Sequence, residues 1–292
     1  MIPCRLRSAF RLAVAYCAAG AVAAVAAGLQ LPPIVGELSG DYTPSELPGA
    51  PALHWQLALA SPTPSERVAH LVADALETHA VAELHLDAAG TGTWQLTEGR
   101  AAVKPWLAGL LVTGAIAATG EGTVRDGVFA GRLKLRPSDF DLGELLRFSD
   151  PDKKYFRAGE GRVGGTIDLE FRAGEFTVGE CVLTIPAGSI GLITFYPNPG
   201  LLTSYVPAQV RKFYPGLEAI ELGRTPLEAH ELRLIVHAAP DQAGRRAYIH
   251  IDGRPHDPKL IAPLILDINL PAELERVIRG FLALRFEATK VR

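Results

Sequence analysis

Four residues near the C-terminal end of the chain have the side chains that commonly bind transition metals. His250, Asp252, His256 and Asp257 lie within eight positions, in the stretch HIDGRPHD. Imidazole nitrogens and carboxylate oxygens are zinc ligands, so the group is a candidate metal site. The surrounding pattern favours a different interpretation, in which His250 and Asp252 share the polar face of a strand that ends in a Gly-Arg-Pro turn. We expect surface residues here, with no metal and no other cofactor.

A glycine-rich stretch has the spacing of a nucleotide-binding loop but lacks its context. Gly159, Gly161 and Gly164 match G-x-G-x-x-G. A dinucleotide site needs a strand before this motif and a helix after it, whereas here an alternating strand pattern follows. The glycines are better explained as turn and strand-edge residues. Cys181 lies inside another strand pattern with no histidine nearby, which predicts a buried, inert thiol.

The stretch DFDLGE contains three acidic residues, Asp139, Asp141 and Glu144. A calcium loop needs more oxygen ligands at fixed intervals, so we expect a solvated turn or short helix. The chain has no G-x-S-x-G nucleophile elbow, and no pair of carboxylates stands out as a general acid and base. We therefore expect a protein that is not an enzyme and rank an exported hydrolase last among the functions.

Composition points to a β-rich protein with a real core. The chain has 292 residues, 48% of them hydrophobic, with 29 glycines and 22 prolines. So many glycines and prolines are typical of short strands joined by turns. The formal net charge of −3 shows no basic surplus of the kind that nucleic-acid binding favours, so we expect no nucleic-acid partner.

The first 36 residues predict a membrane anchor. Arg5, Arg7 and Arg11 precede residues 12–31, which contain no charged side chain. As a helix this run would be about 30 Å long, close to the thickness of a bilayer's hydrocarbon core. Arginines before the run and none directly after it predict a cytoplasmic N-terminus.

A cleaved signal peptide is the alternative interpretation of the same segment. Residues 21–23 and residues 24–26 both read Ala-Val-Ala, which fits the A-x-A cleavage pattern. A helix of a soluble core is a third interpretation. Under either of the first two, residues 37–292 form an exported β-rich domain.

Alternation of apolar and polar residues runs through most of that domain and predicts an antiparallel sheet with one wetted face. Residues 53–59 place leucines and a tryptophan on one face, and residues 81–99 predict a hairpin. In two later strands the apolar positions are Phe129, Leu133, Leu135, Val163, Ile167, Leu169 and Phe171. The fold class expected is mainly β, a twisted antiparallel meander with a few short helices. The pattern is compatible with an open, groove-shaped sheet and with a closed one.

Two helices are expected beside the sheet. Thr63, Pro64 and Glu66 have the types and spacing of a helix start, and apolar residues then follow at helical intervals to about His79. Residues 274–282 predict a final helix with one apolar face.

Several segments together resemble a known family. They read GRLKLRPSDFDLGELLRF, GEGRVGGTIDLEFRAGEFTVGECVLTIPAGSIGLITFYP, AYIHIDGRPHDP and APLILDINLPAELERVIRGF. The pattern, over residues 110–287, resembles the C-terminal part of the YdbH-like family, also labelled dicarboxylate-transport domain, within the AsmA-like group. The resemblance implies a single-pass protein of the bacterial inner membrane whose C-terminal domain lies in the periplasm. It also implies that phospholipid moves along an apolar groove in a β-sheet.

On this interpretation the seven apolar positions on the two later strands line the groove. Residues 188–217, which begin with GSIGLITFYPNPG, form an apolar lid or end-cap on the sheet. The lid residues expected are Ile190, Leu192, Ile193, Phe195 and Tyr196. A plain crossover through the core explains the same stretch. The expected partners are membrane lipid and other cell-envelope proteins. The rival function is a structural or scaffolding envelope protein whose apolar face is only its own core.

The anchor can be tested by placing a charge inside the apolar run. A charged residue at the centre of a spanning helix costs about 2.5 to 3.5 kcal/mol on insertion scales, and this alanine-rich run has few leucines to offset it. We expect Ala21→Arg to block membrane insertion, measured by membrane fractionation of cells. Mass spectrometry of the purified chain gives the opposing outcome: an N-terminus near Ala24 or Ala27 would identify a cleaved signal peptide.

Overall fold

The structure is a computed structural model that describes most of residues 35–269. It covers residues 35–43, 51–103, 113–150, 153–172, 175–237, 239–242, 244–260 and 264–269. Strands make up 62% of these residues, in a large antiparallel meander with short helices, so the mainly β class is confirmed. The helices expected at residues 12–31 and 274–282 lie outside the described residues. Within the ranges given above, no helix has the length and hydropathy that a membrane span requires.

The chain divides into two compact units, and the boundary between them falls within three strands. The described part of unit 1 runs to Pro137 and includes Thr166–Glu180. Unit 2 contains Ser138–Gly165 and Cys181–Glu275. Strands β7 (Val128–Ser138), β10 (Arg162–Arg172) and β11 (Glu175–Thr184) contribute residues to both.

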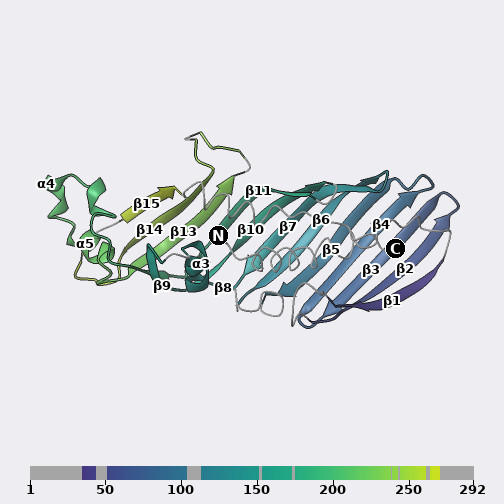
Figure 1. Ribbon diagram of the computed structural model, residues 1–292, viewed down its shortest axis with the longest axis horizontal. Helices are drawn as coiled ribbons and strands as arrows, with labels where there is room; N and C mark the ends of the chain where they lie inside the picture. The colour runs from purple at the N-terminus through teal and green to yellow at the C-terminus, as the bar shows by residue number, and fades with distance from the viewer. Residues whose placement is uncertain are drawn as a thin grey trace. The chain divides into compact units, whose positions relative to one another are not determined.

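Unit 1 is built from consecutive antiparallel strands. They are β1 (Gly36–Tyr42), β2 (Leu53–Thr63), β3 (Glu66–Ala75), β4 (Thr78–Asp87), β5 (Gly92–Ala102), β6 (Ala115–Arg125) and β7 (Val128–Ser138). Each strand is bonded to the next in chain order, and β7 is then bonded to β10. Every regular element that the structure describes in unit 1 belongs to this sheet. Figure 1 shows the succession as a colour gradient from purple to teal.

The helix expected from Thr63 to His79 is wrong, because the segment is the turn between β2 and β3 followed by strand. Thr63 pairs with Glu66, which leaves Pro64 and Ser65 as a two-residue turn. Proline and serine favour tight turns as well as helix starts, so the same residue types serve either structure. The strand forms because Ala69, Leu71 and Ala73 alternate on the buried face of β3.

The hairpin expected over residues 81–99 is present as β4 and β5. Leu84 lies opposite Trp94, as its alternation predicts, whereas Leu86 lies opposite Gly92. The turn between the strands is held by the Asp87 carboxylate, which accepts hydrogen bonds from the backbone N–H groups of Ala89 and Thr91 at 2.9 and 2.8 Å.

Trp94 lies flat against glycines of the neighbouring strands. A methyl group at Gly122, directly opposite Trp94 on β6, would come within 2.5 Å of the indole nitrogen. One at Gly131 on β7 would come within 2.5 Å of the indole ring. The indole N–H donates to the carbonyl of Ala130 at 3.2 Å, and the ring lies 5.1 Å from that of Phe171 on β10. One side chain therefore joins four strands on the apolar face.

Unit 2 combines shorter strands with three short helices and a 3₁₀ turn. The strands that lie wholly in it are β8 (Phe140–Asp141), β9 (Phe156–Glu160), β12 (Gly191–Phe195), β13 (Leu227–His237), β14 (Ala247–Pro255) and β15 (Leu264–Asn269). The helical elements are α3 (Leu142–Ser149), η2 (Thr203–Tyr205), α4 (Ala208–Arg211) and α5 (Pro215–Glu221). Strand β12 lies between β9 and β13, and β14 between β13 and β15, all antiparallel.

Two buried carboxylates fix the loops of unit 2. Asp150 accepts hydrogen bonds from the backbone N–H groups of residues 154–156, at 2.6 to 2.9 Å. Glu221 accepts from the backbone N–H groups of Leu202 and Thr203 at 2.9 and 3.0 Å, and from the Thr203 hydroxyl at 2.8 Å. Burial raises the pKa of Glu221, but these hydrogen bonds together lower it below its ordinary value.

The close packing of Trp94 against Gly122 and Gly131 can be tested by adding a single methyl group. Gly122→Ala places Cβ 2.1 Å from the Ala130 carbonyl oxygen, so strand or ring must shift. Overpacking of this kind typically costs about 1 to 3 kcal/mol, which chemical denaturation should detect as a lower free energy of unfolding. Gly179→Ala on β11 is the matched control, because its methyl group would meet neighbours only at 3.4 Å or more. Equal stability of the two variants would contradict the close approach.

Candidate functional site

The seven residues expected to line a groove are all buried, with exposures of 1% to 9%. Six of them lie on β7 and β10 in unit 1. Leu133 lies opposite Leu169, and Leu135 lies opposite Ile167. Val163 belongs to unit 2, where it lies opposite Phe140 of β8. The structure therefore assembles an apolar face from the six residues of unit 1 and assigns Val163, which is also buried, to unit 2.

The apolar face of unit 1 continues beyond the residues that the sequence singled out. Its further buried members on β2 to β6 include Leu53, Leu57, Leu59, Ala69, Leu71, Ala73, Ala80, Ala82, Leu84, Trp94, Leu96, Ala101, Ile116, Ala118 and Val124. Trp94 is the functional candidate that sequence reasoning missed. The signal that could have identified it is the pair of glycines, Gly122 and Gly131, that lie beside its ring on the next two strands. That signal can be recognised only when the strand register is known.

The five residues expected to form a lid lie in and beside β12. Ile190 precedes the strand and is half exposed, whereas Ile193 and Phe195 are almost completely buried in unit 2. Gly191 is required by packing, because a methyl group there would lie 2.5 Å from the Cδ1 atom of Ile185. The segment is thus a strand of unit 2 that pairs with β9 and β13. This packing explains why a glycine stands at position 191 within an apolar run.

The reverse face of unit 1 is polar and carries opposed charges. Asp41, His54, Asp74, His79 and Arg100 lie opposite one another in a row across β1 to β5. His54 Nδ1 lies 3.0 Å from the Asp41 carboxylate, and His79 Nδ1 lies 2.6 Å from the Asp74 carboxylate. The prediction of one wetted face is confirmed.

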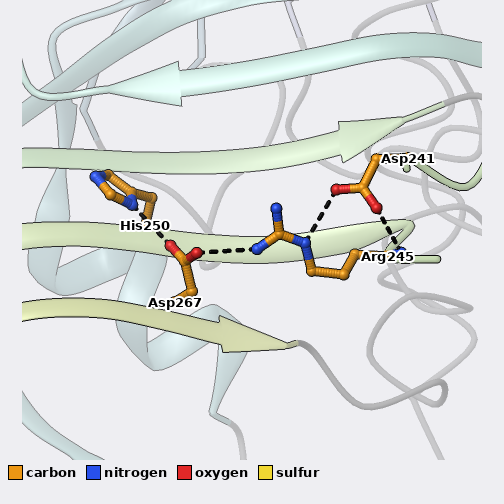
Figure 2. A network of polar contacts seen from close by, with 4 residues as sticks. All are labelled: Asp241, Arg245, His250 and Asp267. Atoms are coloured by element: carbon orange, nitrogen blue, oxygen red, sulfur yellow. Dashed lines mark hydrogen bonds and ion pairs between the residues drawn. The ribbon is translucent and has the colours of Figure 1, made fainter. Parts of the chain in front are cut away.

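A polar network links β14, β15 and the turn before β14. Figure 2 shows Arg245 between two carboxylates: its Nε donates to Asp241 at 3.0 Å and another guanidinium nitrogen to Asp267 at 2.9 Å. His250 Nδ1 lies 2.7 Å from the other oxygen of Asp267. The hydrogen bond with His250, followed by that with Arg245, lowers the pKa of Asp267 against the opposing effect of burial. The guanidinium also lies 4.0 Å from the centre of the Tyr248 ring.

A second network surrounds Glu228 on β13, whose side chain is only 8% exposed. His256 Nδ1 lies 2.9 Å from one carboxylate oxygen, and Arg254 donates to the other at 2.8 and 3.1 Å. His230 Nε2 lies 3.4 Å from the same oxygen as Arg254. The hydrogen bond with His256 is the largest cause that lowers the pKa of Glu228, and Arg254 adds to it.

The four residues of the candidate metal site do not converge. His250 is held by Asp267 and His256 by Glu228. Asp252 is exposed on β14, where it lies opposite Glu231 of β13 and Ile265 of β15. In the described part of the chain, no three histidine, cysteine or acidic side chains are grouped in a way that could hold a metal ion.

The remaining motifs are structural where the chain is described. Gly159 lies on β9, Gly161 in the turn after it, and Gly164 on β10, as the turn and strand-edge interpretation predicts. Asp141 caps α3 by accepting a hydrogen bond from the backbone N–H of Glu144 at 2.9 Å. Cys181 is buried, as expected.

Comparison of the chain with known proteins identified no related protein. No protein-family model, no curated protein and no solved structure matches the chain.

The Glu228 network predicts a stability that depends on pH. A carboxylate whose pKa is lowered by folding stabilises the protein above its unfolded pKa, near 4.3, and this contribution is lost as the pH falls through the lower folded value. Glu228→Gln should therefore lower the free energy of unfolding by about 1 to 2 kcal/mol at pH 7. The difference from the natural chain should shrink below about pH 4.

Glu170→Gln is the matched control, because Glu170 also pairs with an arginine, Arg132, but is 57% exposed. Exposed ion pairs contribute about 0 to 1 kcal/mol, so this variant should be nearly neutral. Thermal unfolding over a pH series distinguishes the two. A pH-independent loss in Glu228→Gln would show that packing rather than charge is responsible.

Proposed function

We propose that this chain is a non-enzymatic, lipid-handling protein that binds phospholipid acyl chains along the apolar face of unit 1. The observation that supports this proposal most directly is the continuous apolar face on one side of the sheet, which extends over β2 to β7 and β10. In the described part of unit 1 each regular element is a strand of one sheet, so no second described layer of that unit packs on this face. Acyl chains have the chemistry that such a face selects.

The character of the side chains supports this proposal. On β3 and β4 the face consists largely of alanines, such as Ala69, Ala73, Ala80 and Ala82, and on β6 it includes glycines. Short side chains leave the backbone close to the surface of the face, so a long, flexible chain can lie along it. The face is shielded from solvent in this structure, and lipid entry requires the covering groups to separate.

The proposed setting is the bacterial inner membrane. On this proposal residues 12–31 form a single membrane anchor, the β-rich part lies in the periplasm, and phospholipid and other envelope proteins are the partners. The resemblance to the YdbH-like family and the arginines ahead of the apolar run support this setting.

Site-specific photo-crosslinking in cells tests the proposal. A benzophenone amino acid fits best at Phe129 and Phe171, which are aromatic and are 9% and 8% exposed. We expect crosslinked phospholipid at these positions and at Ile167, detected by mass spectrometry of the purified chain.

Positions on the polar face of the same strands provide the controls. Asp168 and Glu170 alternate with the apolar positions of β10, and Lys134 does so on β7. The proposal requires little or no lipid at these three positions. Equal capture on both faces would overturn it, and capture on neither face would favour a scaffold whose apolar face is only its own core.

A further inference from the structure

One segment of unit 2 combines exposed apolar surface with positive charge. Residues 196–217 contain no aspartate or glutamate, and their only charged side chains are Arg211 and Lys212. The next acidic residues are the exposed Glu218 and the buried Glu221, so the positive surplus is confined to the segment that ends at Leu217.

An aromatic side chain projects from this segment into solvent. Phe213 is 62% exposed, directly after α4, and the Lys212 ammonium lies 5.1 Å from the centre of its ring. The run of residues 207–209 and both basic residues are exposed as well. Figure 1 shows α4 beyond α5, at the end of the strands β13 to β15.

The segment is held in place by its own hydrogen bonds. The buried Glu221 carboxylate fixes residues 202 and 203 just before α4. The Arg211 guanidinium donates to the carbonyl of Val206 at 3.1 Å, and the backbone N–H of Tyr214 donates to the Arg211 carbonyl at 3.0 Å. Phe213 is therefore presented on a braced turn, which reduces the conformational entropy lost on docking.

We propose that the surface formed by Ala208, Arg211, Lys212 and Phe213 docks onto a bilayer that contains anionic phospholipid. An exposed aromatic ring beside basic residues suits the membrane interface, where the ring enters the headgroup boundary and the cations meet lipid phosphates. Each basic residue near an anionic surface strengthens binding by about fivefold. The inference rests on the proposed function for its choice of lipid as partner, but it uses residues outside the apolar face of unit 1.

Local fluorescence in proteoliposomes distinguishes docking of this surface from attachment of the chain through its N-terminal segment. The full chain carries a fluorescent amino acid at Ala208 and is reconstituted into vesicles whose lipids carry nitroxide quenchers. We expect quenching at position 208 in vesicles of phosphatidylglycerol and phosphatidylcholine, and much weaker quenching in phosphatidylcholine alone. The matched reference position is Leu76, which is 66% exposed in unit 1 and precedes the acidic Glu77.

Two substitutions identify the contributing side chains. Phe213→Ala and Lys212→Glu should each weaken the docking equilibrium about tenfold, the first through lost apolar burial and the second through reversed charge. Arg125→Glu, an exposed arginine of β6 in unit 1, is the charge control and should leave the quenching unchanged.

Three outcomes would overturn the docking surface. They are quenching at position 208 no greater than at position 76, equal quenching in both vesicle types, and no effect of the Phe213 substitution. A protein partner for this surface would produce the first of these. If docking failed but photo-crosslinking at Phe129 and Phe171 still captured lipid, only the docking surface would be wrong. If docking were observed but no lipid was captured at Phe129 and Phe171, only the lipid-binding face would be wrong.

Discussion

The apolar face of unit 1 depends on the way Trp94 lies across the sheet. An indole ring can lie flat on neighbouring strands only where they have no side chains beneath it, and Gly122 and Gly131 meet that requirement. The bond from the indole N–H to the Ala130 carbonyl satisfies the one polar atom of the ring. The contact with Phe171 then extends the packing to β10. Strands that are separated by many residues in the chain are thereby joined on one side.

The two faces of this sheet are specialised in opposite ways, and that contrast supports the proposed function. On one side, alternate positions carry apolar side chains that exclude water. On the other side, rows of acidic and basic residues, such as Asp41, His54 and Asp74, pair across the strands and stay in contact with solvent. A polar reverse face keeps one side of the sheet in contact with water, and the proposed function assigns the apolar side to lipid chains. The same division explains why histidines pair with carboxylates at the surface, as His79 does with Asp74.

Alternation alone was enough to predict the fold class and the orientation of the strands around Leu133 and Leu169, because a period of two residues is a strong signal of half-buried strand. It failed at Thr63, where a helix-start pattern turned out to be a two-residue turn, since turns and helix starts favour the same residues. The role of Trp94 and the pairing of Glu228 with His256 could not be predicted, because both depend on strand register between residues far apart in the chain. The proposal that the ligand is a lipid came from the family resemblance, because no local pattern in the sequence identifies a ligand.

The central claim, that acyl chains contact this apolar face, can be measured at Trp94 itself. The chain has three tryptophans, so replacing Trp55 and Trp106 with phenylalanine leaves Trp94 as the only indole fluorophore. The full chain is then reconstituted with phospholipids whose acyl chains carry bromine, which quenches tryptophan emission on contact. We expect brominated lipid to quench Trp94 strongly relative to the same lipid without bromine. Identical emission in the two lipids would show that no acyl chain reaches this face and that lipid binding there is wrong.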